Sequence, residues 1–188
     1  MKIITGLAAL MLSISSAMAA DYVIDKKGMH ASIQFKISHL GYSWLWGRFN
    51  DFEGSFSYDK EQLSASQVKV SINTNSVDTN HTRRDKHLRS EDFLHVDKFP
   101  RAEFVSTAFE DRGNGSALLT GDLSLHGVTK SIEITVNHLG EGKDPWGGYR
   151  TGFEGQTRIA LADFGITKSL GPASKELDLI LSIEGVRQ

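Results

Sequence analysis

Residues 128 to 140 read VTKSIEITVNHLG. Apolar Ile132, Ile134 and Val136 alternate here with the polar residues Glu133 and Thr135. Successive side chains of a β-strand point to opposite faces, so this period of two predicts a strand with one apolar and one polar face. The stretch is too polar on its second face for a strand that is buried on both sides.

The same pattern recurs along most of the chain, and each run ends at a Gly, Asn, Asp or Pro break. The clearest further runs are SIQFKIS (32 to 38), RAEFVSTAFE (101 to 110), SALLTGDLSLHG (116 to 127), YRTGFEGQTRIALADFG (149 to 165) and ELDLILSIEGV (176 to 186). Turns as short as RGNG, together with the lack of crossover helices between the runs, indicate antiparallel pairing.

A sheet of this size has to hide its apolar face and its edges, either by closing into a barrel or by folding into a sandwich. Several runs exceed the usual five or six residues of a strand, which favours a closed barrel of tilted strands. Glycines inside the runs, such as Gly47, Gly121 and Gly152, predict the bulges and bends that closure needs. We therefore predict an all-β protein, an antiparallel closed β-barrel of about eight strands.

The N-terminus has the pattern of a secretory signal peptide: Lys2, an apolar run over residues 3 to 12, and the small-x-small sequence Ala17-Met18-Ala19. We predict a signal peptide over residues 1 to 19, cleaved after Ala19, followed by one domain over residues 20 to 188. The apolar run is shorter than the roughly 20 residues of a membrane-spanning helix. The prediction is an exported protein without a transmembrane segment.

Composition narrows the classes of partner. Removing Lys2 with the leader leaves 20 Lys and Arg against 23 Asp and Glu, a net charge of −3, which argues against nucleic acid as a partner. The absence of cysteine excludes disulfides and thiolate metal ligands. The sequence leaves the oligomeric state open, and a twofold homodimer is the default for a soluble oligomer.

Five blocks of this chain, in this order, resemble the YceI-like family of periplasmic proteins. The blocks are DYVIDKKGMHASIQFKISHLGYSWLWGRFNDFEGSFSYD (21 to 59), SVDTNHTRRDKHLRSEDFL (76 to 94), KFPRAEFVST (98 to 107), LTGDLSLHGVTKSI (119 to 132) and LDLILSIEGV (177 to 186). The resemblance implies a periplasmic, lipocalin-like barrel that holds a polyisoprenoid, or a similar long-chain lipid or quinone, in its interior. It implies no established catalytic residues and no cofactor.

The apolar stripes supply candidates for the lining of such a lumen. An eight-stranded barrel has an interior that side chains fill or that holds one small ligand. We predict that the lining includes Phe35, Ile37, Trp46, Phe52, Phe56, Val70, Phe104, Leu123, Leu125, Ile134, Val136, Phe153, Leu179 and Leu181. The same stripes also fit a solid core without a ligand.

The polar stretch over residues 76 to 94 interrupts the alternation. The spacing of Thr82 and Asp85 fits a capping box, and Ser90 followed by two acidic residues fits the start of a second turn, so we predict one or two short helices within residues 78 to 95 that cover one mouth of the barrel.

These helices contain candidate ligands for a polar head group. Arg83, Arg84 and Arg89 suit a phosphate, and His81 or His87 suits a quinone oxygen. The alternative is that the basic residues pair with acidic residues between positions 78 and 92 and fix the insertion to the barrel.

Metal and enzyme chemistry find little support in the sequence. His81, His87 and His95 lack the i, i+4 spacing of a helical metal-binding pair, so we predict no metal site. No nucleophile motif is present, so we predict no enzyme; the alternative function is a small periplasmic enzyme or metal-binding stress protein that uses residues 81 to 95.

Tyr42, Trp44 and Trp146 form a further group of interest. They fit either caps on a barrel end or an aromatic rim that touches a membrane.

Overall fold

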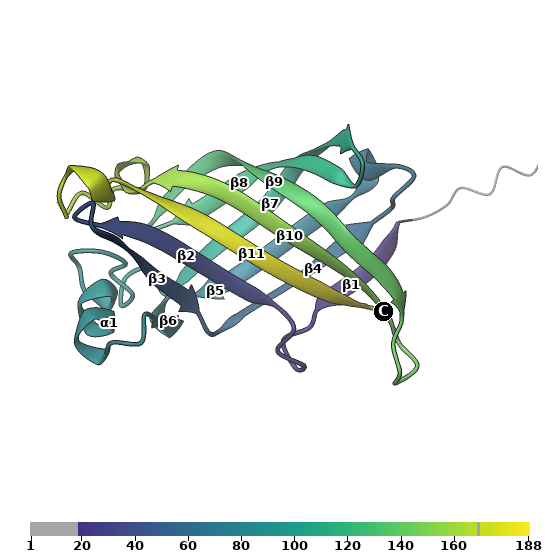
Figure 1. Cartoon of the computed structure of the whole chain (residues 1–188), viewed down its shortest axis with the longest axis horizontal. Helices are drawn as coiled ribbons and strands as arrows, with labels where there is room; N and C mark the ends of the chain where they lie inside the picture. The colour runs from purple at the N-terminus through teal and green to yellow at the C-terminus, as the bar shows by residue number, and fades with distance from the viewer. Residues whose placement is uncertain (1–18, 169) are drawn as a thin grey trace, which may run out of the picture.

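The computed structural model describes residues 19 to 168 and 170 to 188 (Figure 1). Residues 1 to 18, and with them nearly all of the predicted signal peptide, lie outside the described residues. The strands are β1 (Ala20–Ile24), β2 (Ser32–His39), β3 (Ser43–Phe49), β4 (Phe52–Tyr58), β5 (Gln67–Asn73), β6 (Val77–Asp78), β7 (Arg101–Gly113), β8 (Ser116–Leu125), β9 (Val128–Lys143), β10 (Tyr149–Ala160) and β11 (Glu176–Arg187).

One α-helix, α1 (Thr82–Arg89), and four short 3-10 helices complete the described elements. The 3-10 helices span Leu63–Ala65, Thr74–Ser76, Leu161–Phe164 and Pro172–Ser174. Among the described residues, no helix has the length and apolar character that crossing a membrane requires.

All strands belong to one antiparallel sheet that closes on itself. β1 and β2 both pair with β11, one after the other along its length. On their other side, β4 pairs with β1 and β3 pairs with β2. β5 then pairs with β4, and β6 pairs with β3. Counting each of these three successions as one strand gives eight, in a ring that β7, β8, β9 and β10 complete. The prediction of a closed eight-stranded antiparallel barrel with a short helix after residue 78 is confirmed.

Two of the three glycines singled out in the sequence lie at irregularities in the ladder. The β9–β10 register shifts between Gly152 and Phe153, and the β7–β8 register shifts beside the pair Ser106 and Gly121. Gly47 has another role, because a Cβ there would overlap the ring of Phe35 on the paired strand. These positions bend the wall or give a large inward side chain the space it needs.

The inward face changes parity between β3 and β4. Gly47 and Phe49 face inward on β3, whereas Phe52 and Phe56 face inward on β4, so odd positions of β3 and even positions of β4 point into the barrel on the two sides of the corner at Asn50. A shift of one residue moves every side chain of a strand to the other face. The residues before the corner therefore have to be assigned separately from those after it.

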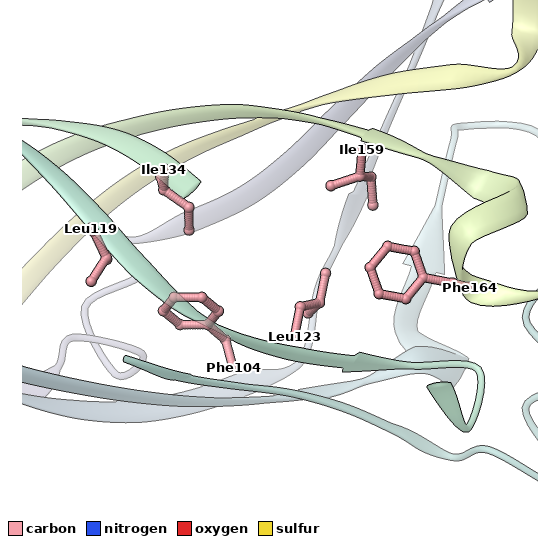
Figure 2. Packing of buried hydrophobic residues seen from close by; sticks show 6 residues of the cluster. All are labelled: Phe104, Leu119, Leu123, Ile134, Ile159 and Phe164. Carbon is pink, nitrogen blue, oxygen red and sulfur yellow. The ribbon is translucent and has the colours of Figure 1, made fainter. Parts of the chain in front are cut away.

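Figure 1 shows that the two ends of the barrel differ. The end that we call the α1 end carries α1, the β2–β3 turn and the segment between β10 and β11, whereas the hairpin end carries the β7–β8 and β9–β10 turns. The buried residues form two clusters on the inner face. One contains Phe104, Leu119, Leu123, Ile134, Ile159 and Phe164 (Figure 2), and the other contains Tyr22, Ile24, Ile33, Phe52 and Phe56.

Candidate functional site: the barrel lumen

A cavity of about 640 Å³ occupies the interior of the barrel. Aliphatic and aromatic side chains from all eight strand positions form most of its wall, because each strand turns its apolar parity inward. The volume lies within the roughly 300 to 1,000 Å³ of small-molecule sites in proteins. In Figure 2 the labelled side chains of β7, β8, β9 and β10 point toward the same interior space.

Twelve of the fourteen predicted lining residues lie on the wall of this cavity. They are Phe35, Ile37, Phe56, Val70, Phe104, Leu123, Leu125, Ile134, Val136, Phe153, Leu179 and Leu181. Phe52 is buried too, but it packs into the cluster around Tyr22 and Phe56 rather than on the cavity wall. The wall is the arrangement expected of a site for an apolar molecule.

The prediction for Trp46 is wrong. Its side chain lies outside the barrel, is 50% exposed and forms part of an outer groove instead. The physical reason is the corner at Asn50, since the parity of β4 does not extend back into β3, where Gly47 takes the inward position against Phe35. Leu45 of the same strand lies on the cavity wall.

Other wall residues were missed by the sequence analysis. Ile33, Ile159 and Ile183 share the parity of predicted neighbours, so the alternation itself could have identified them. Phe93 and Leu170, in contrast, come from segments without alternation, and no periodic signal marks them.

The insertion after β6 contributes part of the wall at the α1 end. His81, rather than Thr82, caps α1: its Nδ1 atom accepts a hydrogen bond from the backbone N–H of Arg84 at 3.2 Å. Asp85 does not reach back to the cap. It accepts hydrogen bonds from the backbone N–H of Thr79, at 2.9 Å, and from the Thr79 hydroxyl, at 2.5 Å, and so ties the buried face of α1 to the preceding loop.

Two of the three arginines in the insertion hold structure together. Arg84 donates to the Thr79 hydroxyl and carbonyl oxygens, both at 2.7 Å, and Arg89 donates to the carbonyl oxygens of Asn75 and Val77, both at 2.8 Å. Their partners are thus mainly backbone oxygens, not the acidic side chains that the sequence suggested.

Two other basic side chains of the insertion, those of His87 and Arg83, differ in whether they have a hydrogen-bond partner. His87 does pair with an acidic neighbour, Asp92, at 2.8 Å, and this bond lowers the pKa of the Asp92 carboxyl. Arg83 is exposed, and among the described residues its side chain has no hydrogen-bond partner.

The head-group candidates therefore do not form one site. Arg84 and His87 lie on the cavity wall at the α1 end, where His39 joins them, whereas His81, Arg83 and Arg89 do not. Most of the wall of the lumen is apolar, and its arginine and two histidines lie at this one mouth.

Comparison with known proteins matches residues 22 to 185 to the model of the YceI-like domain. The chain belongs to the YceI-like family. A UPF0312 protein of Azotobacter vinelandii is 60% identical to this YceI-like protein over 183 residues, which cover 97% of this chain and 95% of the relative.

Solved structures agree on the fold. A YceI protein of Campylobacter jejuni is 29% identical, with a TM-score of 0.72 over 81% of this chain and 91% of that chain. A polyisoprenoid binding domain from Saccharophagus degradans, implicated in plant cell wall breakdown, is 17% identical, with a TM-score of 0.66 over 90% of this chain and 99% of that one. The second likeness concerns the fold alone.

Outside the lumen, this YceI-like protein has a cluster of ionisable groups that the histidine spacing did not reveal. The ligand atoms of Asp25, His30 and Glu184 lie within 4.8 Å of one another, as a metal site would require. However, Arg150 Nη1 donates to Asp25 Oδ2 and to Glu184 Oε1, both at 2.5 Å, and Arg150 Nε donates to Asp144 at 2.7 Å. The guanidinium group supplies the positive charge that these carboxylates need.

The electrostatics of this cluster follow from the same geometry. The hydrogen bond from Arg150, foremost, lowers the pKa of Asp25 to about 2, although burial works in the opposite direction. The pKa of Arg150 is raised in turn by Asp25, Asp144 and Glu184. We interpret the cluster as an ionic network that joins the loop after β1 to the start of β10 and the end of β11.

Proposed function

We propose that this protein is a periplasmic binding or carrier protein for a long-chain isoprenoid, or a similar amphiphilic lipid, held in the barrel lumen. The observation that carries the proposal is the continuous apolar wall around a cavity of about 640 Å³. A water-filled apolar cavity of this size is unfavourable, whereas an apolar molecule in it gains the full hydrophobic effect. The polyisoprenoid binding domain of Saccharophagus degradans has the same fold, which supports the proposal by analogy.

The energetics fit a tail that is recognised by burial alone. Each buried CH₂ group contributes about 0.8 kcal/mol, so one five-carbon isoprene unit contributes roughly 4 kcal/mol before the costs of ordering. Two or three units in the lumen therefore suffice for useful affinity. Discrimination between tails should be shallow, since one methylene changes affinity by only about 1 to 3 kcal/mol.

The polar head is best placed at the α1 end, where His39, Arg84 and His87 lie on the cavity wall. A tail inserted from this mouth leaves its head beside these side chains. Arg84 already donates to Thr79 with Nε and Nη2, so only its remaining N–H groups are available for a phosphate. A phosphorylated head or a quinone would both find donors here.

The cell compartment follows from the sequence pattern of residues 1 to 19. In the periplasm such a protein takes a lipid tail from the bilayer into a dry lumen and carries or stores it through water, without a chemical step. The contacts of Arg84 and Arg89 with backbone oxygens give the 81 to 95 stretch a structural role, so the proposal needs no catalytic or metal function there.

Mass spectrometry of an organic extract tests this function. The protein is purified from the exported fraction without detergent, extracted, and compared with an exported protein of similar size purified in parallel. We expect a long-chain isoprenoid in near-stoichiometric amount in the extract of this protein only. An extract without any enriched lipid would contradict the proposal, and a stoichiometric metal in the protein would favour the alternative function.

A further inference from the structure

Exposed apolar side chains collect at the α1 end of the barrel. Tyr42 is 87% exposed and Trp44 is 56% exposed, and Leu40 beside them and Leu170 on the facing loop are also exposed. Single exposed apolar residues are common on protein surfaces, but a contiguous group of large ones marks an interaction surface. We call these four residues the apolar tip.

The apolar tip continues the wall of the lumen. Leu40 and Leu170 both line the cavity while they remain exposed, so the apolar wall reaches the surface at the β2–β3 turn and the segment before β11. The two segments touch, since a Cβ at Gly171 would lie 3.6 Å from Leu40 Cδ2, and the Ser174 hydroxyl donates to the Ser38 carbonyl oxygen at 2.5 Å. An apolar molecule leaving the lumen here would find Leu40 and Leu170 beside the polar and basic side chains of the same mouth.

The surroundings of the apolar tip carry positive charge. α1 contains three arginines and one lysine against one acidic residue, Asp85, which is buried. Arg83 and Lys86 are exposed on α1, and Lys36 lies 4.8 Å from the centre of the Trp44 ring. This local excess contrasts with the net charge of −2 for the whole chain. Of the neighbouring carboxylates, Asp92 pairs with His87 and Lys168, Asp178 pairs with Lys36, and Glu91 is exposed.

We propose that the α1 end docks onto the surface of an anionic phospholipid bilayer, with the apolar tip inserted among the head groups and the basic face of α1 against the lipid phosphates. Tryptophan and tyrosine prefer this interfacial depth, because one part of each ring is apolar and the other is wet. Arg83 and Lys86 add attraction to negative lipids. The inference rests on the proposed function for its purpose, since docking at this mouth lets a lipid tail move between bilayer and lumen without entering water.

A bilayer fits this surface better than a protein partner does. The apolar tip consists of four residues, on the β2–β3 turn, the start of β3 and the segment before β11, whereas a stable protein interface needs roughly 800 Å² on each side. A small apolar surface with exposed cations nearby matches the mixed hydrophobic and electrostatic binding of peripheral membrane proteins.

Trp146 provides a matched control at the hairpin end. It lies in the turn before β10 and is 76% exposed, and its ring lies 5.4 Å from the Arg150 guanidinium, much as the Trp44 ring lies near Lys36. It thus resembles Trp44 in exposure and in its cationic neighbour but belongs to the other end. If only the α1 end binds the membrane, substitution of Trp146 should leave vesicle binding unchanged.

The test is sedimentation with vesicles of phosphatidylethanolamine and phosphatidylglycerol. We expect the double variant Tyr42→Ser/Trp44→Ser to lower the partition coefficient about tenfold and Trp146→Ser to change it less than about twofold. The variant Arg83→Gln/Lys86→Gln should weaken binding to these vesicles by roughly fivefold per charge, with no change on neutral phosphatidylcholine vesicles. Equal losses for the Trp44 and Trp146 variants, or no binding of the wild type, would overturn the inference.

A second measurement remains informative if the double variant is unstable. With brominated lipids, Trp146→Phe should keep the quenching of tryptophan fluorescence, whereas Trp44→Phe/Trp46→Phe should lose it; the opposite pattern overturns the inference. Failure of membrane docking can be distinguished from failure of the proposed function. A protein that carries an extractable isoprenoid but does not bind vesicles would contradict docking alone.

Discussion

At the hairpin end of the barrel, one guanidinium group binds three carboxylates, whereas at the α1 end the guanidinium groups of Arg84 and Arg89 donate mainly to backbone oxygens. The hairpin end also packs aromatic rings against one another: the centroids of Tyr58 and Phe153 lie 4.9 Å apart. The α1 end instead exposes apolar side chains around the cavity mouth.

The two ends of the same barrel therefore serve different purposes. At the hairpin end, the charge network of Arg150 and edge-to-face aromatic packing hold the strands together. The other end combines an apolar mouth with a short helix that is tied down by a few hydrogen bonds. We infer that a lipid enters and leaves at the α1 end. Three substitutions, ordered from the largest expected effect to the smallest, and then a pH titration test the contrast.

Filling the lumen should have the largest effect. Leu123 is buried on the cavity wall of β8, and Leu123→Trp would occupy the space of roughly one isoprene unit, so we expect at least about a hundredfold weaker binding of a fluorescent polyprenyl analogue. Leu139→Trp, at an exposed position on β9, is the matched control and should bind normally. If Leu123→Trp binds as the wild type does while its fold is intact by circular dichroism, the tail does not lie in the lumen.

Arg150→Met should destabilise the hairpin end strongly. It leaves the Asp25 carboxylate, 6% exposed, without its main partner, and breaking a buried ion pair from one side costs about 3 kcal/mol of unfolding free energy. Arg112→Met is the control, because the exposed Arg112–Glu110 pair should matter by less than about 1 kcal/mol in urea unfolding. Equal losses for both variants would show that the network does not hold this end.

Arg89→Leu should have a smaller effect at the α1 end. The variant removes two hydrogen bonds to the carbonyl oxygens of Asn75 and Val77, which water can partly replace, so we expect a loss of about 1 to 2 kcal/mol in the same unfolding assay. Arg83→Leu, which removes an exposed side chain, should stay within about 0.5 kcal/mol. A larger loss for Arg83 than for Arg89 would reverse our assignment of their roles.

The last test is a pH titration of the charge network at the hairpin end. The pKa of Asp25 falls from about 3.9 in unfolded chains to about 2 in the fold, so its ionised form adds stability that is complete above about pH 5 and is lost as the pH falls toward 2. The difference in melting temperature between the wild type and Asp25→Asn should therefore be constant near neutral pH and vanish in acid. A difference that persists at pH 2 would mean that Asp25 acts by packing and not by charge.

Most residues of the cavity wall could be predicted from the sequence, because the alternation of apolar and polar residues in a strand indicates which side chains face inward. The alternation gave a wrong prediction at the corner beside Asn50, where a shift of one residue turns Trp46 outward. It gave no prediction for Phe93 and Leu170, because their segments do not alternate. The partners of Arg84 and Arg89 could not be predicted, since every residue offers a carbonyl oxygen.

Long-range pairing was equally hidden. Asp25 and Arg150 are 125 residues apart in the chain, and only closure of β1 and β10 against β11 brings them together. Neither residue belongs to a sequence motif that predicts an ionic network. The sequence therefore indicated the fold and most of the lumen, whereas the differences between the two ends emerged only from the three-dimensional arrangement.

A crystal structure of the protein purified from the exported fraction without detergent tests the central claim most directly. We expect one continuous, elongated feature of electron density in the lumen, in contact with Phe104, Leu123 and Leu179 and ending beside Arg84 at the α1 end. A lumen closed by its own side chains, or one that holds only ordered water, would contradict the account.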